Sequence, residues 1–198
     1  MVQNNTRGIP KPYRDMVCIK VCKAEETASN GIIIPVTDEN APRKGIVVSV
    51  GTGTQYQPMV VSVGQVVWYG RYSGSVGVEI EIGGEEYILI HENNIYAIDD
   101  PDSEIPTPIY DMVVIKPTER EDEVTECGII IPGTARDEEL TRYGEIMAVG
   151  SGQLHRPMSV EVGETAIYTK FRSANGVDVV KGKNRYIICR ECEIYAVM

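Results

Sequence analysis

Hydrophobic residues in this chain recur at every second position or form short β-branched runs. Glycine, proline and asparagine separate these stretches at short intervals. Short period-two segments between turn residues predict β-strands. The best helical candidate, residues 135–140, offers one or two turns at most. We therefore expect an all-β fold, whose strands in the first half of the chain are residues 15–20, 45–50, 66–69, 78–82 and 87–90, with a two-residue hairpin turn at Gly83 and Gly84.

The second half of the chain repeats the first. Gly45 corresponds to Gly144 at a separation of 99 positions, which holds for the later landmarks of the repeat, whereas Asp15 corresponds to Asp111 at 96. The change in separation indicates insertions between strands, where extra residues are tolerated. Self-similarity of this kind indicates a tandem array. We predict a first β-barrel domain over residues 1–99, a proline-rich linker over 100–108 and a second barrel over 109–198.

The most distinctive repeated phrase is an isoleucine triplet between glycine and proline. It occupies residues 31–35 and 128–132, with polar, partly acidic runs on both sides. Such runs bury too little apolar surface to order themselves. Each triplet is therefore either a short buried core strand or an exposed adhesive segment that docks on a partner. The candidate residues are Gly31, Ile32, Ile33, Ile34, Gly128, Ile129, Ile130 and Ile131.

Charge narrows the range of partners. The formal net charge is −10, with 8 basic and 11 acidic residues in 1–99 and 11 basic and 18 acidic residues in 100–198. Two acidic halves repel phosphate, so we expect no nucleic-acid partner. The sequence has no apolar run long enough to span a membrane and no charged-then-apolar leader. We therefore expect a cytoplasmic protein without a membrane partner.

Cysteines and histidines give little indication of catalysis. The five cysteines are an odd number without repeat symmetry, which favours reduced thiols over a disulfide framework. Cys189 and Cys192 have the spacing of half a zinc site, but no second pair matches them, so two structural thiols are the preferred interpretation. His91 and His155 occupy unrelated repeat positions, and the glycine-rich phrases lack the third glycine of a dinucleotide site. We expect no catalytic residue, metal or cofactor, and hence no enzyme.

In the order of its landmarks, each repeat resembles a co-chaperonin of the ten-kilodalton GroES type. An opening strand precedes the polar loop with the isoleucine triplet, and a closing strand pair ends in Ile-Tyr-Ala. Between them lie a Gly-x-Val/Ile-x-x-Val-Gly-x-Gly phrase at 45–53 and 144–152 and a Pro-Met-x-Val-x-Val-Gly phrase at 58–64 and 157–163. The resemblance implies two tandem GroES-like β-barrels with a long mobile loop in each.

The resemblance also changes the interpretation of the isoleucines. In that family the corresponding loop is mobile in the free ring, and its glycine-aliphatic segment docks into a hydrophobic groove of the chaperonin's apical domain. It implies that both triplets bind a GroEL-type chaperonin, which itself binds the ATP, and that loops 24–43 and 120–142 are poorly ordered without it. Copies of the chain would form a homo-oligomeric ring, whose many loops turn weak contacts into strong capture. The implied function is a co-chaperonin that caps the chaperonin ring and assists ATP-dependent protein folding.

Two features depart from the family's usual pattern. Only residues 54–57 and 153–156 stand where the family has a roof hairpin, so we expect a truncated roof hairpin and an open-topped ring. The duplication resembles plastid-type double co-chaperonins, and two-domain chains cannot fill a seven-position partner evenly. Either one loop position goes unused, or only one domain of each chain forms the ring. The alternative function is a structural or particle-associated protein that uses the GroES-like barrel as an assembly module.

Overall fold

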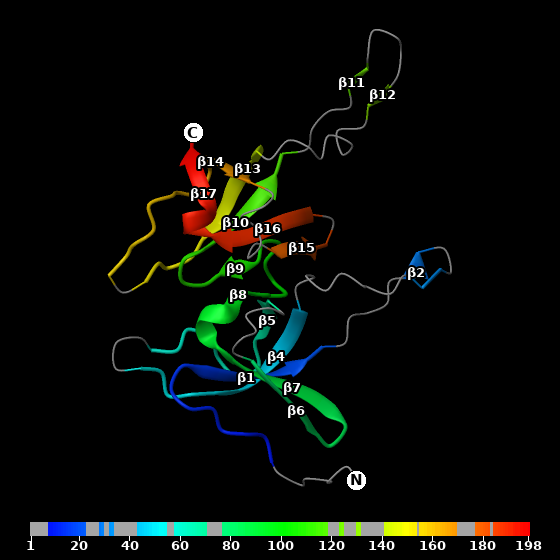
Figure 1. Cartoon of the computed structure of the whole chain (residues 1–198), viewed down its shortest axis with the longest axis vertical. Coiled ribbons are helices and arrows are strands. Elements are labelled where there is room, and N and C mark those ends of the chain that lie inside the picture. Colours follow the sequence, from blue (N-terminus) through cyan, green and yellow to red (C-terminus); the bar gives the residue numbers. More distant parts are fainter. Residues whose placement is uncertain are drawn as a thin grey trace.

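The protein is all-β, as the hydrophobic pattern predicts (Figure 1). The computed structural model describes residues 8–22, 28–29, 32–33, 43–54, 58–70, 77–118, 123–124, 130–131, 141–153, 155–169, 177–182 and 184–198. These residues form strands and two short 3₁₀ turns, with no α-helix and no helix that could cross a membrane among them. The helical candidate at 135–140 lies outside the described residues.

The first barrel is a seven-stranded antiparallel sheet in the order β6-β7-β1-β4-β5-β8-β9. Side chains two residues apart in a strand point to the same face, which is why Val17 and Ile19 are both fully buried and meet Val47 and Val67 in one core. The elements are β1 (Met16–Val21), β4 (Arg43–Val50), β5 (Val66–Tyr69), β6 (Val78–Ile82), β7 (Glu85–His91), a 3₁₀ turn (Glu92–Asn94), β8 (Ile95–Ile98) and β9 (Thr107–Pro108).

The second barrel repeats the first six strands of this order, as β15-β16-β10-β13-β14-β17. The register shift between Cys18 and Ile19 in the first barrel recurs between Val114 and Ile115 in the second. The predicted tandem architecture is therefore confirmed. The elements are β10 (Met112–Pro117), β13 (Thr141–Val149), β14 (Thr165–Thr169), β15 (Val177–Lys181), β16 (Asn184–Arg190), a 3₁₀ turn (Glu191–Glu193) and β17 (Ile194–Val197).

The repeated Gly-x-Gly phrase packs against the residue that precedes the opening strand by two positions. A Cβ atom on Gly51 would collide with the carbonyl group of Arg14, and the amide of Gly53 donates to that carbonyl at 3.0 Å. Arg14 itself has a left-handed backbone, with φ of 52°. Glycine is therefore required by the close approach of two backbones. The same contacts recur in the second repeat among Gly150, Gly152 and Tyr110.

Residues 107–110 join the first barrel rather than the second. β9 pairs with β8, with Pro108 opposite Ala97 and Thr107 opposite Ile98. Ile109 and Tyr110, which are 2% and 5% exposed, lie in the first barrel's core. The opening segment of the second repeat thus crosses the first barrel before β10 begins. The division into residues 1–99, 100–108 and 109–198 stays a prediction.

A separate apolar cluster joins the two barrels. Tyr96 and Ala97 on β8 are buried against the sheet face of the second barrel, and Trp68 packs at the edge of this cluster. Because both partners bury apolar surface, the contact favours one arrangement of the barrels. The second barrel contributes Met112, Val114, Val177, Val179, Tyr186 and Ile188.

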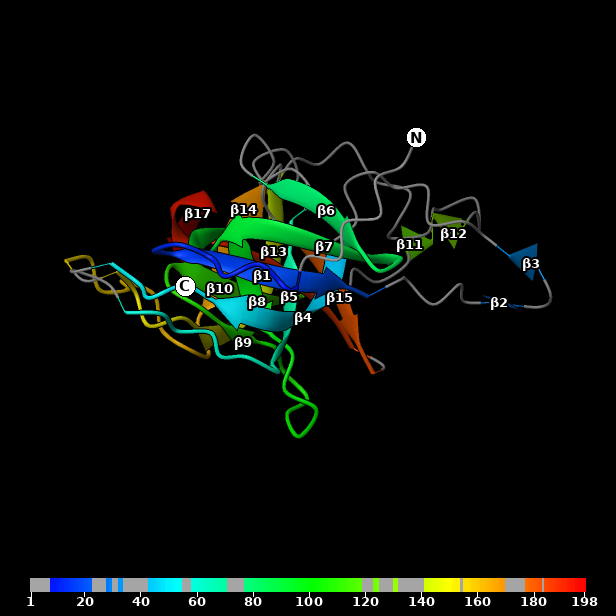
Figure 2. The ribbon, with the colours of Figure 1, turned by 90° about the horizontal axis from the view of Figure 1, so that it is seen from below.

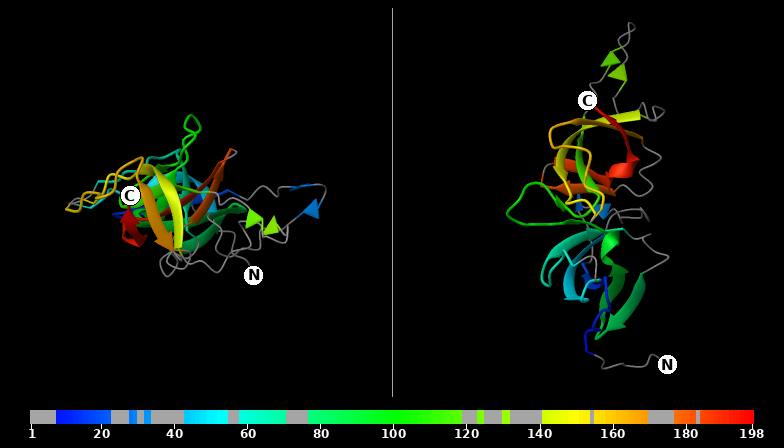
Figure 3. Two further views of the ribbon diagram at one scale, coloured as in Figure 1. Left: turned by 90° about the horizontal axis from the view of Figure 1, so that it is seen from above. Right: turned by 90° about the vertical axis from the view of Figure 1, so that its left-hand side faces the viewer.

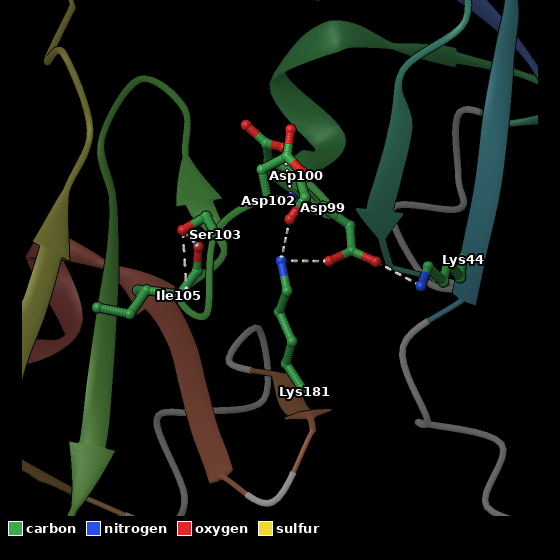
Figure 4. Close-up of polar contacts among 7 residues, drawn as sticks. All are labelled: Lys44, Asp99, Asp100, Asp102, Ser103, Ile105 and Lys181. Atoms are coloured by element: carbon green, nitrogen blue, oxygen red, sulfur yellow. Dashed lines mark hydrogen bonds and ion pairs between the residues drawn. The ribbon is translucent and has the colours of Figure 1, made fainter.

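Polar contacts reinforce this junction between the barrels (Figure 4). The Lys181 ammonium lies 2.7 Å from Oδ1 of Asp99 and donates to the Asp100 carbonyl at 2.6 Å. Lys44 forms an ion pair with the other oxygen of Asp99. Burial alone would raise the pKa of the Asp99 carboxyl, but the two lysine ammoniums outweigh burial and hold that pKa below its ordinary value. Lys181 comes from the second barrel and Asp99 from the first, so the carboxylate bridges the two.

Replacing Asp99 by asparagine is expected to destabilise the protein at neutral pH but not in acid. Because folding lowers the pKa of this carboxyl, its stabilisation is fully present above the ordinary value of 3.8 and disappears as the pH falls through the lower folded value. Urea unfolding of wild type and variant across this range measures the difference. The matched control is Asp178→Asn, which removes an exposed ion pair with Arg185 and should change stability little. If wild type and variant still differ in the free energy of unfolding at acid pH, the lowered pKa of Asp99 is not the cause of the difference.

Candidate functional site: the two isoleucine hairpins

The first isoleucine triplet contributes to a short β-hairpin. β3 (Ile32–Ile33) pairs antiparallel with β2 (Ala28–Ser29), with Ile33 opposite Ala28 and Ile32 opposite Ser29. This pair is a two-stranded sheet of its own and shares no strand with either barrel. We call it the first hairpin.

The second triplet forms an equivalent hairpin. β12 (Ile130–Ile131) pairs antiparallel with β11 (Glu123–Val124), with Ile131 opposite Glu123 and Ile130 opposite Val124. It too is a separate two-stranded sheet, which we call the second hairpin. The two hairpins differ in charge, because a carboxylate residue stands opposite an isoleucine only in the second.

This pairing favours docking over the core-strand interpretation of the triplets. A core strand would extend one of the barrel sheets, but the four described isoleucines Ile32, Ile33, Ile130 and Ile131 pair only within their own hairpins. A segment outside the barrels is what docking on a partner requires. The remaining predicted site residues, Gly31, Ile34, Gly128 and Ile129, lie outside the described residues.

The strands that pair with the isoleucines, β2 and β11, were not predicted from the sequence. Asn30 and Gly31 are the two residues that connect β2 and β3, and Asn-Gly is the dipeptide most favoured in two-residue hairpin loops. That signal predicts the first hairpin. Residues 125–129 connect β11 and β12, and this longer connection carries no equivalent two-residue signal.

Both hairpins lie on one side of the molecule, each at the same end of its own barrel (Figure 2). The first follows β1 and precedes β4, and the second follows β10 and precedes β13. These strands are antiparallel neighbours in their sheets, so each connection leaves its barrel at the same end. Figure 2 shows the two labelled hairpins on the same side, with the segments that follow β4 and β13 extending to the opposite side, and the left view of Figure 3 shows the same arrangement by colour.

That opposite side carries the sites of the expected roof hairpins. Gln153 and Arg156 exchange two backbone hydrogen bonds, each 2.9 Å long, which close a tight turn. The contact between Gln153 and Arg156 is that of a turn, as the short spacing predicts, and residue 154 lies outside the described residues. The corresponding residues 55–57 of the first repeat lie outside the described residues.

In each barrel a buried carboxylate holds the segment that follows the Gly-x-Gly phrase, which we call the roof-side segment. Oε1 of Glu92 accepts hydrogen bonds from the amides of Val60 and Val61 at 2.7 and 2.8 Å, and the Tyr110 hydroxyl donates to its Oε2. In the second barrel the amide and hydroxyl of Ser159 donate to Glu191. Neither glutamate is recognisable from the sequence as a buried residue, because a lone acidic residue beside a turn gives no signal of burial.

Cys189 and Cys192, which have the spacing of half a zinc site, occupy different environments. Burial raises the pKa of the Cys189 thiol to about 12, so it is protonated at neutral pH and a poor metal ligand, whereas Cys192 is exposed. Burial also raises the pKa of Cys18 to about 11, and Cys127 lies outside the described residues. Within the described part of the chain, no three His, Cys, Asp or Glu residues form a group that could hold a metal ion.

The histidines also have distinct surroundings. Nδ1 of His91, at the end of β7, lies 2.9 Å from a carboxylate oxygen of Asp15, and Arg190 makes the equivalent contact with Asp111 in the second barrel. His155 lies in the exposed turn between Gln153 and Arg156. The position of His91 is thus that of a structural hydrogen bond with Asp15.

Two stretches of the chain, residues 10–98 and 106–198, match the family model described as "Chaperonin 10 Kd subunit". The chain is 29% identical over 198 residues to the "20 kDa chaperonin, chloroplastic" of Spinacia oleracea, covering 95% of this chain and 74% of the relative. Identity to the protein of the same name from Arabidopsis thaliana is 30%, over 95% of this chain and 75% of the relative. An 88-residue match to "Co-chaperonin GroES" of Porphyromonas gingivalis is 44% identical and covers 44% of this chain and 96% of that protein. The plant relatives therefore align with both repeats, and the bacterial relative has the length of one.

Proposed function

The chain belongs to the Chaperonin 10 Kd subunit family, and on this premise we propose that it is a co-chaperonin that caps a GroEL-type chaperonin ring through its two isoleucine hairpins. The observation that carries the proposal is the presence of two isoleucine hairpins outside the barrel sheets and on one side of the molecule. A partner with a flat rim of repeated grooves can engage both hairpins at once.

Isoleucine is suited to a contact of this kind. Each isoleucine side chain gains about 1.5–3 kcal/mol when it is fully removed from water. Ordering the polar flanks of the hairpin consumes part of that gain, so a single hairpin binds weakly. Two hairpins per chain, multiplied by the copies in a ring, raise the effective concentration and give strong binding overall. Weak individual contacts also allow the cap to leave when the partner changes conformation.

The short strands of the hairpins support a role in reversible docking. Each strand has two residues, and an isolated two-stranded hairpin is at best marginally stable in water. A partner that covers the isoleucines would therefore contribute much of the stability of the hairpin. The barrels hold the hairpins in place, and the hairpins make the contact.

The proposed partner supplies the nucleotide chemistry. The chaperonin binds and hydrolyses ATP, and this chain responds to the conformation that the chaperonin presents. The copies of the chain form a ring, with the barrels side by side, the hairpins toward the chaperonin and the short 153–156 turn on the far side. A ring with turns in place of roof hairpins leaves an opening at its top.

Association with a GroEL-type chaperonin tests the proposal directly. The full chain is mixed with the chaperonin with ATP, with ADP and without nucleotide, and the complexes are separated by gel filtration. We expect co-elution only with nucleotide, together with faster recovery of a denatured client enzyme. An absence of association under all three conditions would overturn the proposal and favour the structural or particle-associated alternative.

A further inference from the structure

The connection that carries the first hairpin leaves and re-enters its barrel at one root, formed by the end of β1 and the start of β4. Val21 pairs with Gly45, and the amide of Cys22 donates to the carbonyl of Lys44 at 3.0 Å. This hydrogen bond lies where the connection begins and ends. Contacts that hold residues 22 and 44 therefore also hold the direction in which the first hairpin leaves the barrel.

The second hairpin has a root with the same backbone contacts. Pro117 pairs with Gly144, and the amide of Thr118 donates to the carbonyl of Tyr143 at 3.0 Å. Tyr143 corresponds to Lys44 at the repeat separation of 99 positions. The two roots thus share one backbone arrangement and differ in the side chain at this position.

The side chain of Lys44 is held by two neighbouring strands. Its ammonium forms an ion pair with Oδ2 of Asp99 and lies 5.1 Å from the ring centroid of Trp68, the residue directly opposite on β5. A cation is attracted by the electron-rich face of an indole ring. The amide of Asp99 donates to the carbonyl of Val66 at 2.8 Å, which fixes the carboxylate beside β5. Lys44 therefore reaches from β4 across β5 to the end of β8.

The second barrel holds the same carboxylate in place. Figure 4 shows Asp99 between Lys44 and Lys181, with one carboxylate oxygen toward each ammonium. The side chains of Lys181 and Asp99 are 15% and 11% exposed, so water and salt screen this contact less than they screen an exposed ion pair. One carboxylate thus connects the root of the first hairpin to the second barrel.

The root of the second hairpin has different residue types at these positions. Tyr143 is 43% exposed, Ile167 stands at the position of Trp68, and Met198, which is 72% exposed, stands at the position of Asp99. None of these three side chains carries a charge, so the ion pair and the cation–π contact of the first root have no equivalent among them. The backbone pairing of the two roots is the same, and the side chains make the difference.

We propose that Lys44 and Asp99 are positioning residues that fix the direction of the first hairpin, and that the second hairpin, without this contact, adjusts its direction when it docks. We call the contact of Lys44 with Asp99 and Trp68 the root anchor. The positioning role rests on the proposed function, whereas the root anchor is a property of the free chain.

One fixed and one adjustable hairpin suit a partner that presents repeated grooves. The fixed hairpin loses little freedom on docking, because its direction is set before contact. The second hairpin then meets a neighbouring groove at the high effective concentration that the first contact provides. Its adjustable direction accommodates a difference between the spacing of the hairpins and the spacing of the grooves.

Hydrogen exchange of single amides in the full chain, without any chaperonin, tests the root anchor. We expect Lys44→Met to speed exchange of the Cys22 amide about three- to thirtyfold, because an ion pair and a cation–π contact are lost. The Thr118 amide makes the equivalent hydrogen bond in the second repeat and should exchange as in wild type. Lys44→Arg keeps the charge and the contact with the indole ring, so it should retain slow exchange at Cys22.

Lys20→Met is the matched control, because it removes another lysine close to the same root. Its ion pair with Glu85 joins side chains that are 37% and 52% exposed, so exchange of the Cys22 amide should change less than about twofold. Unchanged exchange at Cys22 in Lys44→Met, or an equal rise at Thr118, would overturn the root anchor. So would a Lys44→Arg chain that exchanges like Lys44→Met.

Chaperonin binding tests the positioning role separately. Lys44→Met should weaken capture severalfold in the otherwise unchanged chain, and it should change nothing when residues 32–34 are already serine. Equal losses in both backgrounds would contradict the positioning role. If the wild-type chain does not bind the chaperonin at all, the proposed function and the positioning role fail together, whereas the exchange rates still decide whether the root anchor exists.

Discussion

Replacing residues 32–34 and 129–131 by serine is expected to abolish chaperonin binding while leaving the melting temperature nearly unchanged. The hairpins share no strand with the barrel sheets, so the barrels lose no backbone pairing when the isoleucines are removed. Each isoleucine removed from the contact costs about 1.5–3 kcal/mol of binding free energy, and 1.4 kcal/mol is a factor of ten in affinity. Loss of one triplet should therefore weaken binding at least about tenfold. Gel filtration with the chaperonin and nucleotide, together with thermal unfolding, measures both quantities.

The opposite outcome has a distinct signature. Three buried isoleucines exchanged for serine would remove several kcal/mol from a domain whose stability is of order 5–15 kcal/mol. A large fall in melting temperature would thus assign the triplets to a packed interior and contradict the docking role. The control is the exchange of Val63 and Val162 for serine, which removes exposed apolar side chains that lie outside both hairpins. That variant should bind normally.

The two single-hairpin variants should differ from one another. In the second hairpin Glu123 stands directly opposite Ile131, and Glu121 and Asp122 precede it in the sequence. A carboxylate beside a docking isoleucine must lose water when the isoleucine enters an apolar groove, which opposes binding. In the first hairpin the residues opposite Ile33 and Ile32 are Ala28 and Ser29, and neither is charged. We therefore expect serine replacement of residues 32–34 to cost more affinity than replacement of residues 129–131, and equal losses would show that the carboxylate stays in water.

The barrel strands could be predicted because their signals are local. Residues 66–69 are a short apolar run and residues 78–82 alternate in hydrophobicity, and they form β5 and β6 with those bounds. Gly83 and Gly84 have φ of 63° and 82°, as the predicted two-residue turn requires. In each case neighbouring residues in the sequence determine the structure, and the repeat doubles the signal.

The junction between the barrels could not be predicted, because its contacts join residues far apart in the chain. β9 has two residues, one of them a proline, within a stretch whose composition indicates a linker. It becomes a strand only because the β8 edge lies beside it. Lys181 gives no sign in the sequence that it will reach Asp99. The candidate site shows the same limit, since the isoleucines are evident in the sequence and the strands opposite them become clear only in the structure.

Glu92→Ala is expected to lower the free energy of unfolding by about 3 kcal/mol or more, the largest single-residue loss that the structure indicates. The side chain is 2% exposed, and its two oxygens accept from the amides of Val60 and Val61 and from the Tyr110 hydroxyl. Alanine removes the acceptor that these three donors share. Each buried, unsatisfied donor costs about 1–3 kcal/mol, and relaxation of the roof-side segment recovers part of that cost.

Glu92→Gln separates the loss of hydrogen bonds from the loss of charge. Glutamine keeps the oxygen that accepts from Val60 and Val61, and the Tyr110 hydroxyl can rotate to accept from the new amide, so the expected loss is under about 1.5 kcal/mol. The surface control Glu161→Ala should stay within about 0.5 kcal/mol of wild type. Urea unfolding of the three variants provides the comparison. A loss for Glu92→Ala no larger than that for Glu161→Ala would show that water reaches the three donors, and that the glutamate does not hold the roof-side segment to the barrel.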